Sequence, residues 1–86
     1  MGSKTNPGIY DCYSNALPDE PMFILLARDP DAPSLIEWWA DNRESAIDQK
    51  LRPESDRAMV AEARKCAKDM RTWRSTNDGK WRSSRP

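Results

Sequence analysis

The apolar residues of this chain fall in three stretches, and each follows a proline placed like the first turn of a helix. In the first stretch, residues 22–28, Phe23 and Leu26 share one helix face. Asp19 is placed to cap the free backbone N–H groups, and Pro21 stands where a missing N–H costs nothing. A short buried strand is the alternative, because so short an apolar run has no decisive period. We expect a helix, because the capping residues fit one and no partner strand is evident.

The second stretch begins after Asp29-Pro30, where the residue before proline avoids the α region and the first helix should end. Asp31 is placed to cap a new helix, with Pro33 in its first turn. Helical spacing puts seven residues on one stripe: Ala32, Leu35, Ile36, Trp39, Ala40, Arg43 and Ile47. The opposite face is acidic and carries Glu37, Asp41, Glu44 and Asp48. Trp38 lies beside the stripe, so we expect part of the tryptophan pair to stay near the surface.

The third stretch follows Pro53 and is the longest, about residues 54–75. Its apolar residues alternate spacings of four and three, which is a heptad-like seam: Met59, Ala63, Cys66, Met70 and Trp73. Val60 and Ala67 widen this seam. The small side chains in its middle should let another helix approach closely. Outside the seam the stretch is basic.

Together these patterns predict an all-α fold: a small three-helix domain over residues 19–75, an extended N-terminal arm over 1–18, and a basic flexible C-terminal tail over 76–86. The expected core joins all three helices: Phe23, Leu26, Leu35, Ile36, Trp39, Met59, Ala63, Cys66, Met70 and Trp73. The arm's tyrosines, Tyr10 and Tyr13, either pack over this core or stack on a ligand. A chain of 86 residues buries only roughly 60% of its unfolded surface, so its stability is marginal. We therefore also expect a homo-oligomer, formed through the third helix and Trp38.

Charge divides the chain into two halves although the net charge is zero. Residues 1–56 carry five basic and eleven acidic side chains, a balance of −6, and residues 57–86 carry nine basic and three acidic, a balance of +6. Such a chain either folds its basic end onto its acidic half or offers the two ends to other molecules.

No set of residues with the chemistry of a catalytic or metal site is evident. Histidine is absent, which removes the commonest general base and the commonest metal ligand. Cys12 and Cys66 lack the paired spacing of a zinc site, and we expect free thiols. Helix capping accounts for Asp19 and Asp31, which an enzyme would otherwise use with Asp29 as acid and base. We therefore expect a protein that is not an enzyme and that binds no cofactor and no metal.

The basic third helix and the tail carry the candidate binding residues. Cations beside aromatic rings suit phosphate pairing and base stacking, as in proteins that bind nucleotides or single strands. The alternative is a solvated helix face that pairs with the acidic second helix. The residues we expect to bind a ligand or partner are Trp38, Arg64, Lys68, Arg71, Arg74, Trp81 and Arg82.

Part of the chain resembles a group of small uncharacterised proteins of bacteriophages and prophages. The residues that carry the resemblance are YDCY at 10–13, the pattern D-E-P-x-F-x-L-x-A-x-D at 19–29, A-P at 32–33 and W-A at 39–40. A later part, from residue 61 to 73, resembles the third segment of these proteins, so the similarity covers roughly residues 9–74. The resemblance implies a phage origin and no particular reaction.

These observations favour a non-enzymatic phage protein that captures or inhibits a host defence or regulatory protein. The alternative is sponge-like binding of a nucleotide messenger or a single-stranded nucleic acid through the basic third helix. No apolar run is long enough to cross a membrane, and no secretory leader is evident, so we expect the host cytoplasm.

Overall fold

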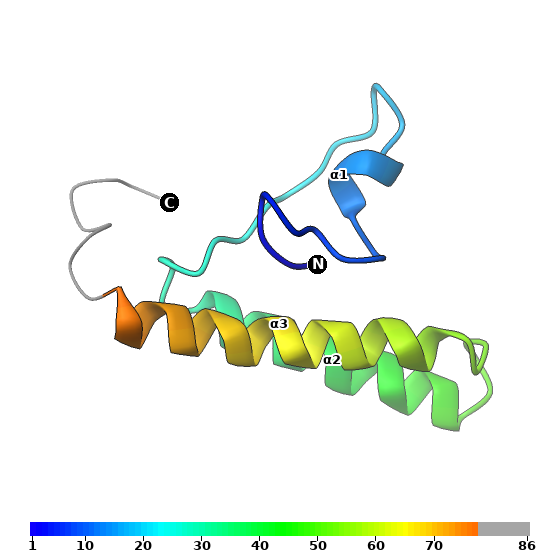
Figure 1. Cartoon of the computed structure of the whole chain (residues 1–86). Coiled ribbons are helices and arrows are strands. Elements are labelled where there is room, and N and C mark those ends of the chain that lie inside the picture. The colour runs from blue at the N-terminus through cyan, green and yellow to red at the C-terminus, as the bar shows by residue number, and fades with distance from the viewer. Residues whose placement is uncertain (78–86) are drawn as a thin grey trace.

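The computed structural model describes residues 1–77 as a helical hairpin covered on one side by irregular chain. α2 (Ala32–Asp48) and α3 (Asp56–Thr76) run antiparallel and lie side by side (Figure 1). A third element, α1 (Cys12–Asn15), is a single short turn in the N-terminal part. No strand occurs within residues 1–77, so the predicted all-α fold with three helices is confirmed.

The prolines and aspartates set the starts of the two long helices, although not by the predicted cap bonds. Pro33 lies in the first turn of α2, where the backbone needs no N–H donor. Asp31 occupies the N-cap position, but its side chain makes no cap bond. Instead the Asp29 carboxylate accepts a hydrogen bond from the N–H of Asp31 at 2.9 Å. The turn that ends α2 places Lys50 in the left-handed region at φ 61°, which turns the chain toward α3.

Small side chains form the contact between the two helices. Ala40 and Ile47 of α2 meet Val60 and Ala63 of α3 in one buried cluster, and Ala67 is buried one turn further along α3. None of these side chains is more than 5% exposed. Because alanine has no side chain beyond Cβ, the two backbones can approach closely along this line.

The buried face of α3 is therefore rotated from the predicted seam. The residues in contact with α2 follow Val60, Ala63 and Ala67, whereas Cys66 and Met70 are only partly buried and Trp73 is 39% exposed. Of the predicted seam, Ala63 alone is fully buried. The large side chains turn toward the N-terminal segment instead, because the alanine face allows the closer helix–helix contact.

The helix predicted over residues 22–28 is wrong, because this segment is irregular and turns only near residues 27–31. The alternative, a strand, is absent as well. Phe23 is 85% exposed and Leu26 42% exposed, so neither belongs to the core as predicted. A helix of two turns does not form in isolation and needs packing partners, and this segment lies between Pro21 and Pro30.

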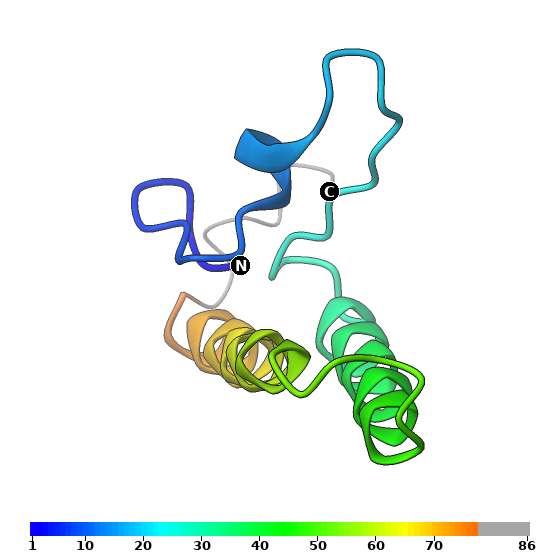
Figure 2. The ribbon, with the colours of Figure 1, turned by 90° about the vertical axis from the view of Figure 1, so that its right-hand side faces the viewer.

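The third helix of the fold, α1, lies in the predicted N-terminal arm and not at residues 22–28. The Asp11 side chain accepts a hydrogen bond from the N–H of Tyr13 and so begins this turn. Viewed along the hairpin, the N-terminal chain lies over α3 while residues 20–30 descend to the start of α2 (Figure 2). One side of the hairpin is thus covered by chain without long helices.

The apolar stripe predicted on α2 is only partly buried. Ile36 and Trp39 are partly buried against the core cluster, and the Arg43 guanidinium lies 4.9 Å from the centre of the Trp39 ring. Leu35 is 49% exposed, which contradicts its predicted place in the core, because its position on the helix points away from α3. Trp38 is 66% exposed, as expected for the residue beside the stripe.

Candidate functional site

Ion pairs join the acidic side chains of α2 to the basic side chains of α3. The Arg64 guanidinium lies 2.9 Å from the Asp41 carboxylate and also pairs with Glu44. Arg71 pairs with both oxygens of Glu37, at 2.7 and 2.8 Å. The charges that divide the sequence into two halves are therefore paired along much of the hairpin.

Two of the predicted binding residues, Arg64 and Arg71, are held in these ion pairs. The hydrogen bond from Arg71 lowers the pKa of the Glu37 carboxyl, and the Asp41 carboxylate raises the pKa of Arg64. A phosphate that approached Arg64 or Arg71 would have to displace a carboxylate that already accepts from the guanidinium. The two arginines therefore act first as links between the helices.

The other predicted residues do not converge on one place. Arg74 donates to the backbone carbonyls of Arg28 at 2.6 Å and Ala27 at 3.4 Å, and so fastens the segment before α2 to the end of α3. Lys68 is exposed and has no ion pair within residues 1–77. Trp38 lies on α2. The remaining two predicted residues, Trp81 and Arg82, lie outside the described residues.

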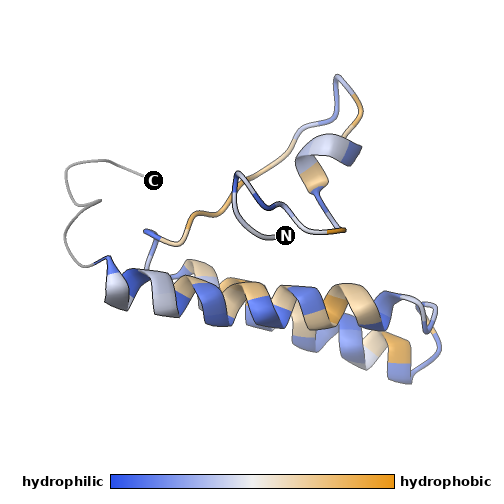
Figure 3. Cartoon of the chain, in the orientation of Figure 1, coloured by the Kyte–Doolittle hydropathy of each residue, from blue (hydrophilic) through white to orange (hydrophobic). Residues whose placement is uncertain are grey.

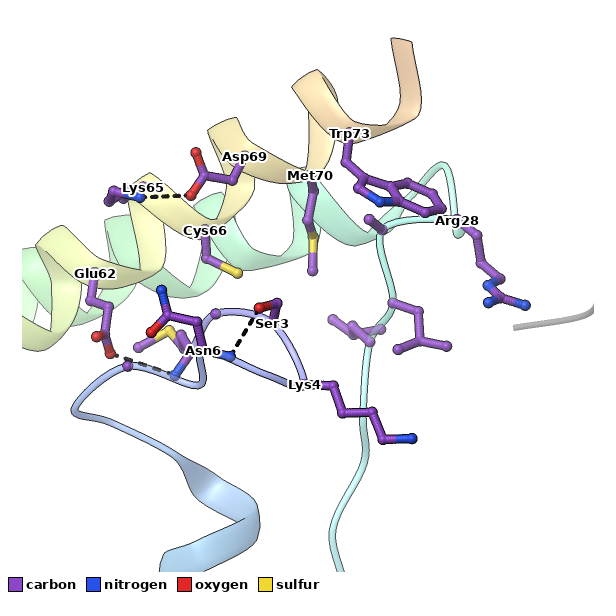
Figure 4. Close-up of a pocket in the computed structure, with 16 residues that line it drawn as sticks. Ser3, Lys4, Asn6, Arg28, Glu62, Lys65, Cys66, Asp69, Met70 and Trp73 are labelled. Atoms are coloured by element: carbon purple, nitrogen blue, oxygen red, sulfur yellow. Dashed lines mark hydrogen bonds and ion pairs between the residues drawn. The ribbon is translucent and has the colours of Figure 1, made fainter. Parts of the chain in front are cut away.

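A groove of about 560 Å³ lies between α3 and the chain that covers it. Cys66, Met70 and Trp73 reach into it from α3, and Leu25 and Leu26 line it from the irregular segment (Figure 4). The loop over residues 1–8 closes one side. Sequence reasoning missed this groove because its lining comes from three segments that are far apart in the chain.

Glu62 holds the N-terminal loop at the edge of this groove. Its carboxylate accepts hydrogen bonds from the N–H groups of Ile9 at 3.0 Å and Tyr10 at 3.1 Å. The amino group of Met1 lies 3.5 Å from the same carboxylate and also donates to the carbonyl of Tyr10. Burial raises the pKa of Glu62, but these N–H groups and the positive charge outweigh it, so the net pKa is lowered.

The two cysteines differ in their surroundings. Cys12 is exposed, Cys66 is half-buried, and both are free thiols. Burial raises the pKa of the Cys66 thiol, which makes it a poor nucleophile at neutral pH. Within residues 1–77 no three His, Cys, Asp or Glu side chains gather to hold a metal ion, and no helix is long and apolar enough to cross a membrane.

Many large apolar residues lie outside the core, and the irregular chain that leads to α2 contains a hydrophobic stretch (Figure 3). The fully buried positions hold mainly alanine, whereas much bigger groups are exposed. The exposed set is Ile9, Tyr13, Leu17, Met22, Phe23, Ile24, Leu26, Leu35, Trp38, Leu51 and Trp73. Single exposed apolar residues are ordinary, but runs such as residues 22–24 indicate contact surfaces. Comparison with protein-family models, with curated proteins and with solved structures finds no match to this chain.

Proposed function

We propose that this chain is a non-enzymatic, phage-encoded binding protein that captures a host defence or regulatory protein in the host cytoplasm. The observation that carries the proposal is the inversion of size between core and surface: alanines are buried while Phe23 and Trp38 are exposed. Exposed apolar side chains of this size contribute most to the free energy of binding when another molecule covers them. The phage origin rests on the sequence resemblance over residues 9–74.

The outer face of α2 is the surface best suited to a protein partner. Leu35 and Trp38 are three residues apart and 49% and 66% exposed, so they form neighbouring apolar groups on one helix face. The buried contact with α3, through Ala40 and Ile47, holds this helix in place. A tryptophan on a preorganised helix is a typical centre of binding energy in protein interfaces.

Capture of a nucleotide messenger or single strand is less well supported. Of the basic residues expected to bind phosphate, Arg64 and Arg71 already pair with carboxylates, and Arg74 donates to backbone carbonyls. We expect tryptophan fluorescence to stay flat when nucleotides are titrated at low salt. A saturable response that weakens steeply with salt would instead favour the nucleotide.

The test is retention of one host protein by the immobilised chain. Wild-type protein should retain a single dominant bacterial protein at near-equal stoichiometry, and Trp38→Ser should retain at least about tenfold less. Leu51→Ser is the matched control, because Leu51 is 73% exposed but lies in the loop between the helices. Equal retention by all three proteins, or none by wild type while the circular dichroism remains helical, would count against the proposal.

A further inference from the structure

The groove beside α3 combines an apolar floor with positive charge that has no carboxylate partner among residues 1–77. Cys66, Met70 and Leu26 supply apolar floor. Lys4 and Arg28 also line the groove, and neither side chain forms an ion pair with a carboxylate among residues 1–77 (Figure 4).

The other charged groups of the groove already have partners. Lys65 pairs with Asp69 at 2.8 Å, and Glu62 accepts from the N-terminal loop. The net charge that the groove offers to a ligand is therefore positive, and the surface beneath it is apolar. An occupant that matches it carries carboxylates next to large apolar side chains.

The chain itself presents such a segment. Residues 19–24 read DEPMFI, so two carboxylates stand immediately before three large apolar side chains. Met22 is 50%, Phe23 85% and Ile24 60% exposed. This part of the chain descends from a loop above the helical hairpin toward the start of α2 (Figure 1). It has no regular secondary structure, so it can adapt to a groove.

We propose that this groove is the docking site for residues 19–24 of a second copy of the chain, with Phe23 on the apolar floor and Asp19 and Glu20 beside Lys4 and Arg28. Within one chain these side chains do not fill the groove, because Phe23 stays 85% exposed and the groove remains open. The basic residues that follow α3 in sequence would bring charge of the same sign as the rim.

Reciprocal exchange gives a two-fold dimer in which each copy buries one segment and one groove. An aromatic side chain alone carries roughly 150–250 Å². Three large side chains and the surface that receives them therefore reach the order of 800 Å² per partner, the size of a specific interface. The exchange differs from the contact through α3 and Trp38 that the sequence suggested, and it leaves Trp38 available to another protein.

The first test is mass in solution by light scattering at micromolar concentration. Wild type should have twice the mass of one chain, and Phe23→Ser should be monomeric with unchanged helix content, because this side chain makes little contact within its own chain. Leu51→Ser, equally removed from the core, should remain dimeric. A monomeric wild type, or a Phe23→Ser protein that stays dimeric, would overturn the proposal.

A charge exchange identifies the surfaces. Protein with Lys4→Glu and Arg28→Glu should dimerise about 10–100-fold more weakly, and so should protein with Asp19→Lys and Glu20→Lys. Mixed together they should form a heterodimer, because each groove then meets a segment of opposite charge. Absence of the heterodimer would refute the docking. All these measurements use purified chain without a host protein, so failure here leaves the proposed capture untouched.

Discussion

Enlarging Ala63 tests the close approach of α2 and α3 on which the fold depends. This side chain is 0% exposed and lies in the cluster with Ala40, Ile47 and Val60. Ala63→Leu adds three carbon atoms at a position with no exposure to solvent, so the helices must separate or the leucine must adopt a strained rotamer. Overpacking of this kind costs about 1–3 kcal/mol.

That free energy is large for so small a domain. One kcal/mol shifts the melting temperature of a 60–100-residue domain by roughly 4–8 °C, so Ala63→Leu should lower it by about 5–20 °C. The assay is thermal unfolding followed by circular dichroism of the helices. Ala61→Leu is the matched control: the same change on the same helix, at an exposed position, should alter stability by less than about 0.5 kcal/mol.

Equal effects of the two substitutions would refute the reasoning. They would mean that the face of α3 carrying Ala63 does not meet α2 closely.

Three further predictions concern the arm, the ion pairs and the thiols. Glu62→Gln should speed hydrogen exchange of the amides of residues 9–10 about tenfold or more, since a charged acceptor is lost. In wild type the protection should be full above about pH 4.3 and fall as the pH passes below it, since docking lowers the pKa of Glu62; constant protection down to strongly acidic pH would contradict this. Arg71→Ala should destabilise by less than about 1 kcal/mol in chemical denaturation, since its ion pair is exposed, and a larger loss would show that the pair is a main support of the fold. Iodoacetamide should alkylate Cys12 faster than Cys66, whose pKa burial raises, and equal rates in the folded protein would contradict that burial.

The two long helices could be predicted from sequence because each repeats its pattern over several turns after a proline. The fold class followed from them. The rotation of α3 could not, because large apolar residues such as Met70 and small ones such as Ala67 lie close together on its surface. The sequence predicted that small residues would let a helix approach closely, but it centred the seam on the large residues and placed Ala67 at its edge. Close packing against α2 buries the alanines instead.

The segment of residues 22–28 shows a different limit. Its apolar run and its capping residues fit a helix, but a helix of that length depends on a surface to pack against. The hairpin is already covered by the loop over residues 1–8, which Glu62 holds in place. These hydrogen bonds join backbone N–H groups to a side chain more than fifty residues away, and no pattern in the sequence predicts them.

The candidate site was predictable only in part. The sequence left open whether the basic residues pair with the acidic helix or face other molecules, and Arg64 and Arg71 pair with α2. Trp38 is exposed, as its position beside the stripe suggested. The groove beside α3 required the three-dimensional arrangement, because Lys4, Leu25 and Met70 are brought together only by folding.

The most direct test of stoichiometric capture is the native mass of the purified chain together with the host protein that it retains. We predict one stable complex with equal numbers of the two chains, in which the host protein keeps its mass after prolonged incubation. Substoichiometric amounts of this chain that alter the mass of the host protein would contradict the account, because they would reveal turnover.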